Sequence, residues 1–138
     1  MVASMATPII YACSGGCNLG QMANYAALCL DRARVGKMSS VAGVGGDIAG
    51  FLAIAKSRRQ IVAIDGCQKQ CAKRCLERHG VGMRHYVLTE FGLTKQSCLD
   101  FDESEAAFIF EHIRTALAKP AGSIVSPTRS SAADSIRR

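Results

Sequence analysis

Three cysteines recur at every fourth residue in the middle of the sequence: Cys67, Cys71 and Cys75. In a helix this spacing places the side chains along one side, with neighbouring Cβ atoms about 5–6 Å apart. Zinc prefers four thiolate or imidazole ligands arranged as a tetrahedron. The spacing therefore predicts that these thiols share a metal ion or a thiol reaction. The simpler alternative is that they are small residues of the core.

A fourth ligand has to come from another part of the chain. Cys13 is the best placed candidate because it ends a predicted strand, and Cys17 follows in the next turn. His79, one helical turn beyond Cys75, is the third candidate. The residues alone leave the choice among these three open.

The composition is that of one domain with few specific partners. The 138 residues carry a net charge of +6, and 49% of them are hydrophobic. Seven cysteines, an odd number, argue against a disulfide framework and favour a protein of the reducing cytoplasm. With 6% aromatic residues, no tryptophan and no long apolar run, we expect neither specific nucleic-acid binding nor membrane insertion. The sequence is compatible with a homodimer.

Strands and helices alternate along the chain, which predicts how the thiols are positioned. Short apolar segments predict strands, and amphipathic segments between them predict helices. The expected strands are residues 8–13, 37–42, 59–65 and 85–88, and the expected helices are residues 20–34, 48–54, 68–79 and 102–117. This order predicts an α/β fold, a three-layer Rossmann-like or flavodoxin-like sandwich with a four-stranded, mainly parallel sheet. We expect residues 1–6 to be flexible, residues 7–119 to form one domain and residues 120–138 to be disordered.

Right-handed crossovers place every strand-to-helix loop at one edge of a parallel sheet, where open α/β sheets bind ligands. The loops expected there are residues 13–18, 42–47, 65–68 and 89–92. The topology therefore predicts that Cys13 and Cys17 lie close to Cys67.

Other motifs carry weaker signals. The loop after Cys13 resembles the placement of a phosphatase loop, but Leu19 stands where that chemistry needs an arginine. Residues 43–46 form a glycine-rich turn, after which Asp47 is the expected N-cap of the next helix. Asp65 is expected either to cap the cysteine helix or to hydrogen-bond a metal ligand without binding the metal itself. Four further residues receive no site role: Cys29, Cys98, His85 and His112.

The motifs together resemble the DGC-domain family of zinc-binding proteins. The matching segments are Cys13-Ser14-Gly15, Asn18-Leu19-Gly20-Gln21, Gly36-Lys37-Met38-Ser39, Ala42-Gly43, Ile64-Asp65-Gly66-Cys67 and Cys71-Ala72-Lys73-Arg74-Cys75-Leu76-Glu77. The resemblance covers about residues 8–118. It implies that Cys13, Cys67, Cys71 and Cys75 are the zinc ligands, and it implies no established reaction. The chain departs from the family pattern at Ser40, where a cysteine is frequent, and at Cys17, which could replace it as a ligand.

Two other functions remain open at this point. Cysteine-rich loops at one end of a sheet can also hold an iron–sulfur cluster. Alternatively, the protein is a thiol enzyme or sulfur carrier in which Cys67 is the nucleophile and Cys13, Cys17 or Cys71 resolves the intermediate. The sequence does not decide whether the protein is an enzyme.

Overall fold

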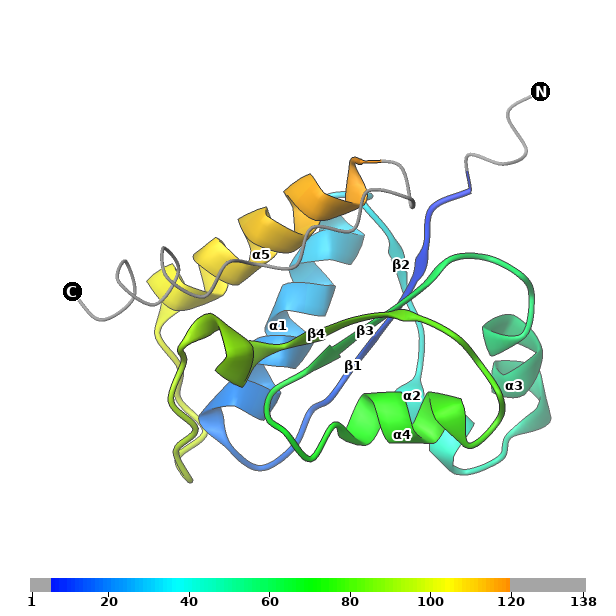
Figure 1. Cartoon of the computed structure of the whole chain (residues 1–138), viewed down its shortest axis with the longest axis horizontal. Helices are drawn as coiled ribbons and strands as arrows, with labels where there is room; N and C mark the ends of the chain where they lie inside the picture. Colours follow the sequence, from blue (N-terminus) through cyan, green and yellow to red (C-terminus); the bar gives the residue numbers. More distant parts are fainter. Residues whose placement is uncertain (1–5, 120–138) are drawn as a thin grey trace.

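Four parallel strands form a single sheet in the order β2-β1-β3-β4 (Figure 1). The computed structural model describes residues 6–119 of the chain. The strands are β1 (Ile9–Ala12), β2 (Lys37–Met38), β3 (Ile61–Asp65) and β4 (Arg84–Val87). Since this is the strand order of flavodoxin-like sheets, the predicted α/β fold is confirmed. Of the segments expected to be flexible or disordered, 1–6 and 120–138, all residues but Ala6 lie outside the described part of the chain.

Helices cover both faces of the sheet, as Figure 1 shows. One face carries α1 (Asn18–Arg32) and α5 (Glu103–Leu117), and the other carries α2 (Val41–Gly45), α3 (Ala49–Ala55) and α4 (Cys71–Glu77). A short 3₁₀ helix, η2 (Leu88–Phe91), follows β4 directly. None of the helices in this part of the chain is long and apolar enough to cross a membrane.

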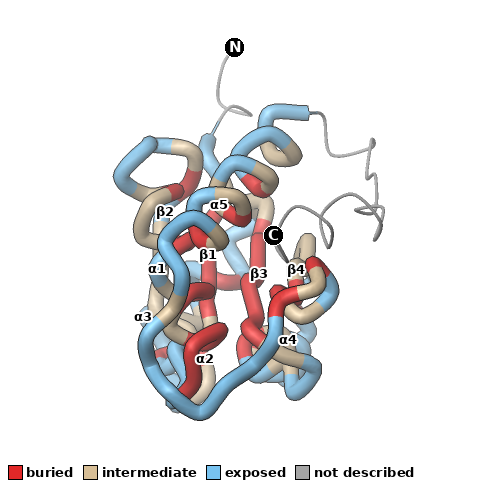
Figure 2. Tube along the Cα trace, turned by 90° about the vertical axis from the view of Figure 1, so that its left-hand side faces the viewer, coloured by how far each residue is buried: buried red, intermediate tan, exposed pale blue. Residues whose placement is uncertain are grey.

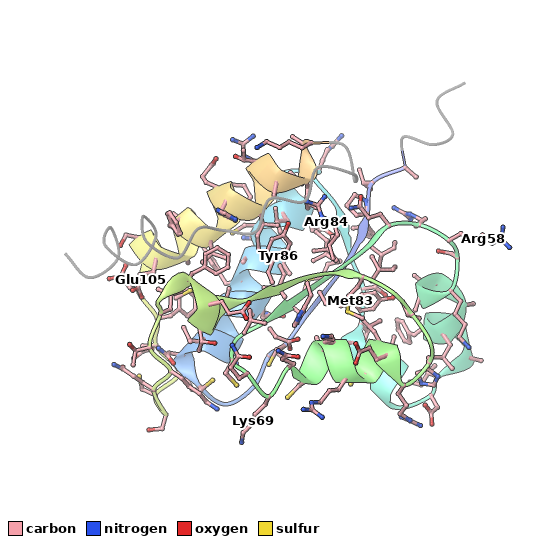
Figure 3. All side chains as sticks on the ribbon, viewed as in Figure 1. Arg58, Lys69, Met83, Arg84, Tyr86 and Glu105 are labelled. Atoms are coloured by element: carbon pink, nitrogen blue, oxygen red, sulfur yellow. The ribbon has the colours of Figure 1, made fainter. Side chains whose placement is uncertain are left out.

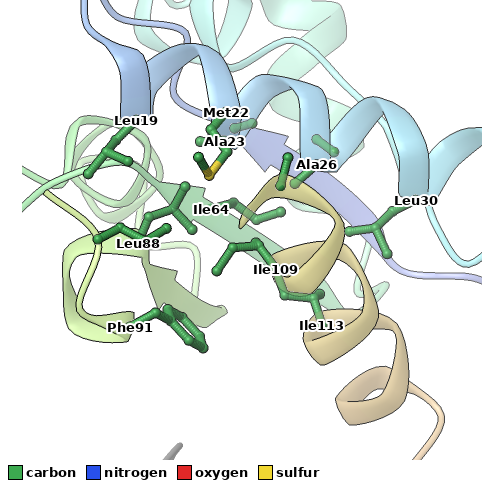
Figure 4. Close-up of a cluster of buried hydrophobic side chains, with 14 of the residues drawn as sticks. Leu19, Met22, Ala23, Ala26, Leu30, Ile64, Leu88, Phe91, Ile109 and Ile113 are labelled. Carbon is green, nitrogen blue, oxygen red and sulfur yellow. The ribbon is translucent and has the colours of Figure 1, made fainter. Parts of the chain in front are cut away.

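The two central strands are buried on both faces, because every residue of β1 and β3 is covered (Figure 2). Their side chains alternate between two core clusters, one on each face of the sheet. The larger cluster lies between the sheet, α1 and α5, where Met22, Ile64 and Ile109 converge (Figure 4). This double coverage explains why the strands read as continuous apolar runs.

Strand β2 has two residues and lies at the edge of the sheet. The N–H groups of Lys37 and Ser39 point toward β1 and bind Pro8 and Ile10. The intervening N–H of Met38 points away from the sheet and donates to the Asp31 carboxylate on α1 at 2.7 Å. The outward donor of this edge strand is therefore occupied by a side chain of the same molecule.

Three predicted boundaries are wrong. The second strand ends at Met38 and not at residue 42. The Ser40 hydroxyl accepts from Gly43 N at 3.0 Å and so caps α2, a helix that occupies the place of the expected glycine-rich turn. Asp47 does not cap the following helix. Its backbone has φ of 60°, and its carboxylate instead binds Arg78 at the end of α4.

The third error concerns the cysteine helix. Helix α4 begins at Cys71, three residues later than predicted, because Gln70 adopts a left-handed conformation with φ of 55°. Cys67 therefore lies in the loop before the helix. Only Cys71 and Cys75 keep the helical spacing that the sequence predicts for three thiols.

His112 on α5 predicts an acid-sensitive contribution to stability. Its ring lies 4.9 Å from that of Phe91, edge to face, and burial followed by the charge of Lys119 lowers its pKa below the ordinary 6.5. The unfolded chain therefore binds this proton more readily. The stabilising contribution of neutral His112 to the folded state is complete above pH 6.5. It is lost as the pH falls through the lower pKa of His112 in the folded state.

We expect His112→Phe to remove that part of the pH dependence. Thermal melting of both proteins at pH 8, 6.5 and 5 measures it, and the wild type should lose more stability toward pH 5 than the variant. Equal losses in the two proteins would show that His112 does not contribute.

Candidate thiol site

The candidate site lies where the strand order changes direction, between β1 and β3. In open α/β sheets ligands bind outside the carboxyl ends of the strands at such a point. Cys13 directly follows β1, and Gly66 and Cys67 directly follow β3. Figure 3 shows Lys69, in the same loop as Cys67, pointing outward at this end of the molecule.

Cys13 is half-buried at the end of β1. Its sulfur accepts a hydrogen bond from Gly15 N at 3.3 Å. Burial raises the pKa of this thiol, and the N–H groups of Gly15 and Gly66 offset part of the effect. Electrostatic interactions with Cys71 and Asp65 raise the pKa further. Cys13 is therefore a protonated thiol with acidic neighbours.

Cys75 has a similar environment one turn along α4. Burial is the main cause of its raised pKa, followed by the charges of Cys71 and Asp65. The sulfur faces α2, where a Cβ on Gly45 would lie 3.2 Å from it. Cys71 therefore acts electrostatically on both Cys13 and Cys75, and it is the exposed member of the three.

Cys67 and Cys17 have separate partners. Lys95 Nζ donates to the Cys67 sulfur at 3.6 Å, so an ammonium group lies beside this half-buried thiol. Cys17 is 8% exposed and is the N-cap of α1, where its sulfur accepts from Gly20 N at 3.3 Å. A ligand role for Cys17 would compete with this capping role.

The remaining candidates lie elsewhere. His79 Nε2 lies 2.9 Å from Asp47 Oδ1, at the far end of α4. Cys29 lies in the last turn of α1, and Cys98 donates to Gln96 Oε1.

The thiols share one edge of the sheet without forming a finished metal site. Throughout residues 6–119, no three cysteine, histidine, aspartate or glutamate side chains form a group that could hold a metal ion as they stand. Cys13, Cys71 and Cys75 interact electrostatically, and Cys67 has Lys95 as a separate partner. Ligation by three or more of them would require the loop before α4 to move.

Asp65 contributes more than the sequence suggests. It is 1% exposed and accepts from Ala72 N at 2.8 Å and from Lys73 N at 3.1 Å, so it caps α4, as one of the two predicted roles requires. His85 Nε2 lies 2.7 Å from its Oδ2. Sequence reasoning missed His85, because its contact with Asp65 depends on the strand register that sets it beside Ala63.

Comparison with known proteins gives one family and one relative. The family model of the DGC domain matches residues 9–113. The chain is also 45% identical over 111 residues to the anaerobic and virulence modulator AnvM of Pseudomonas aeruginosa, an alignment that covers 80% of this chain and 85% of the relative. No solved structure matches the chain.

Proposed function

This chain belongs to the DGC-domain family, and on that premise we propose that it is a metal-binding protein that takes up zinc through thiols at the sheet edge. The placement of Cys13 and Cys71 at the end of β3 carries the proposal, because Cys13 N donates to Ile64 O at 2.9 Å and Asp65 caps the helix that begins at Cys71. Burial is the main cause of the raised pKa of Cys13 and of Cys75, and electrostatic interactions with Cys71 and Asp65 add to it. A divalent cation among them reverses that repulsion and displaces the thiol protons.

The chemistry of the donor set fits zinc, whereas its arrangement fits only in part. Thiolate sulfur is a preferred zinc ligand, and Cys13 and Cys71 are the pair around which we place the ion. Cys67 and Cys75 are the next ligands, and both require movement toward Cys71. Cys17 is the least favoured ligand, because its sulfur caps α1. Zinc uptake is therefore proposed to rearrange the loop between β3 and α4.

The number of protein ligands decides what the metal can do. Four thiolates give a closed site with a structural or storage role, and three leave a position at which zinc acts as a Lewis acid. We place the protein in the cytoplasm, where thiols remain reduced. The name of AnvM, a modulator, suits a protein whose thiols report on metal or redox conditions.

Metal analysis after purification under reducing conditions tests the proposal. We expect about one zinc ion per chain in the wild type. Cys13→Ser and Cys71→Ser should lose most of it, because each removes a central ligand. Cys29→Ser and Cys98→Ser are the matched controls, since both remove a thiol outside the site, and they should keep the metal.

Three results would contradict the proposed zinc site, and two of them would support a specific alternative. A visible absorption band in anaerobically purified protein would favour an iron–sulfur cluster. Absence of metal with selective alkylation of Cys67 would favour a thiol enzyme, the reading that the contact with Lys95 supports. Equal metal loss in all four cysteine variants would mean that ligation is nonspecific.

A further inference from the structure

The carboxylate of Asp65 is the best-connected buried polar group at the sheet edge. It has three donors within hydrogen-bond distance: Ala72 N at 2.8 Å, Lys73 N at 3.1 Å and His85 Nε2 at 2.7 Å. With 1% of its surface exposed, it has almost no access to water. The group therefore depends on these protein partners for its solvation.

Helix α4 lacks the cap that a helix normally has at its own start. The residue before it, Gln70, has a left-handed backbone and makes no side-chain capping hydrogen bond. The first free N–H groups of the helix bind Asp65 at the end of β3. Because the cap comes from the sheet, it fixes where the helix begins relative to the sheet. The residue at that beginning is Cys71. Cys13 N donates to Ile64 O at 2.9 Å, so Cys13 also adjoins the end of β3 that carries Asp65.

His85 restrains the orientation of this cap. In the parallel register of β3 and β4 it stands beside Ala63, and Ala63 and Asp65 share one face of β3. Its ring nitrogen contacts Oδ2, the same oxygen that accepts from Lys73 N. Loss of this contact leaves the carboxylate free to rotate away from one helix N–H.

We propose that His85 and Asp65 are positioning residues, which hold the start of α4 on the sheet so that Cys71 stays beside Cys13. The inference rests on the proposed function only in that the proposed function assigns Cys13 and Cys71 as ligands. The arrangement itself concerns the protein without metal, and it links β4, through β3, to the central thiol of the site.

Bridging of the two thiols measures this positioning directly. The background protein keeps Cys13 and Cys71 and carries serine in place of the other cysteines, since serine can also cap α1. The replaced residues are Cys17, Cys29, Cys67, Cys75 and Cys98. Dibromobimane, which becomes strongly fluorescent only after it has alkylated two thiols, is the probe. The readout is the rate of bridging, normalised to the rate of single alkylation.

His85→Phe should slow the bridging about tenfold, because a hydrogen bond to a charged group is lost. His85→Gln should restore most of the rate, since its amide nitrogen can replace Nε2, and His85→Asn should not, because it is too short. His79→Phe is the matched control: its side chain is 14% exposed against 16% for His85, and it also lies beside an aspartate, at the other end of α4. This control should bridge at the parental rate.

The result that overturns the inference is an unchanged bridging rate in His85→Phe, or equal rates in His85→Gln and His85→Asn. If His85→Phe does not fold by circular dichroism, the glutamine and asparagine variants decide alone. Zinc competition against a chromophoric chelator, on the protein with all its cysteines, then separates the two proposals. Bridging that follows the expected order in a protein that binds no zinc would refute the metal site and keep the positioning role.

Discussion

Asp65→Ala is expected to lower the free energy of unfolding by about 3–5 kcal/mol. The substitution leaves the N–H groups of Ala72 and Lys73 without their acceptor at the start of α4. It also removes the partner of a mostly buried histidine, His85. Urea denaturation followed by circular dichroism measures the loss.

Asp102→Ala is the natural control. Asp102 also caps a helix with two N–H groups, those of Ser104 and Glu105, but at an exposed site where water can replace the lost acceptor. Its loss should be clearly smaller. Similar losses in the two variants would mean that Asp65 acts as an ordinary cap, without the added cost of burial.

Gly66→Ala is expected to be almost as damaging, with a loss of about 3 kcal/mol. A Cβ at this position would lie 2.7 Å from the carbonyl carbon of Leu19 and 2.8 Å from Gly20 N. Both atoms belong to the backbone of α1, so they cannot rotate aside as a side chain would. The melting temperature should fall by about 10 °C in a thermal scan.

Gly50→Ala tests whether the effect comes from the lack of space. Gly50 lies within α3, and an added Cβ meets nothing within 4 Å. Alanine is the better helix former there, so stability should rise by about 0.5–1 kcal/mol. A Gly66→Ala protein that melts like the wild type would show that the contact between the β3–α4 loop and α1 is loose.

The sheet could be predicted from the sequence because its central strands are apolar along their full length. Residues 61–65 are buried on both faces, and such runs are typical of parallel strands covered by helices. Parallel strands also determine which loops meet, so the approach of Cys13 to the end of β3 followed from chain order. Asp102 as the cap of the last helix was likewise predictable, because its hydrogen bonds are local.

The start of α4 could not be predicted, because the deciding interaction is not local. Residues 68–70 have no strong helix-breaking signal, so the sequence offers no reason to start the helix only after them. The helix starts at Cys71 because Asp65, at the end of β3, accepts hydrogen bonds from Ala72 N and Lys73 N. The three-thiol face expected from Cys67, Cys71 and Cys75 failed for this reason. His85 was missed for a related one, since its role depends on the register of β4 against β3.

Helix α2 was missed because its composition argues against it. Two of its five residues, Gly43 and Gly45, are glycines, which are poor helix formers. The Ser40 cap and the packing of α2 on α4 outweigh that propensity. Gly45 also gives the Cys75 sulfur its room, so the composition of α2 serves the thiol edge more than the helix itself.

The short edge strand β2 has a consequence for self-assembly. An open sheet edge can recruit a strand from another chain, which leads to sheet extension and aggregation. Here the outward N–H of Met38 is already bound by Asp31, and the neighbouring Lys37 adds an exposed charge. A second copy would have to displace Asp31 before it could pair with β2. Association between copies of this chain is therefore expected to use a surface other than the β2 edge.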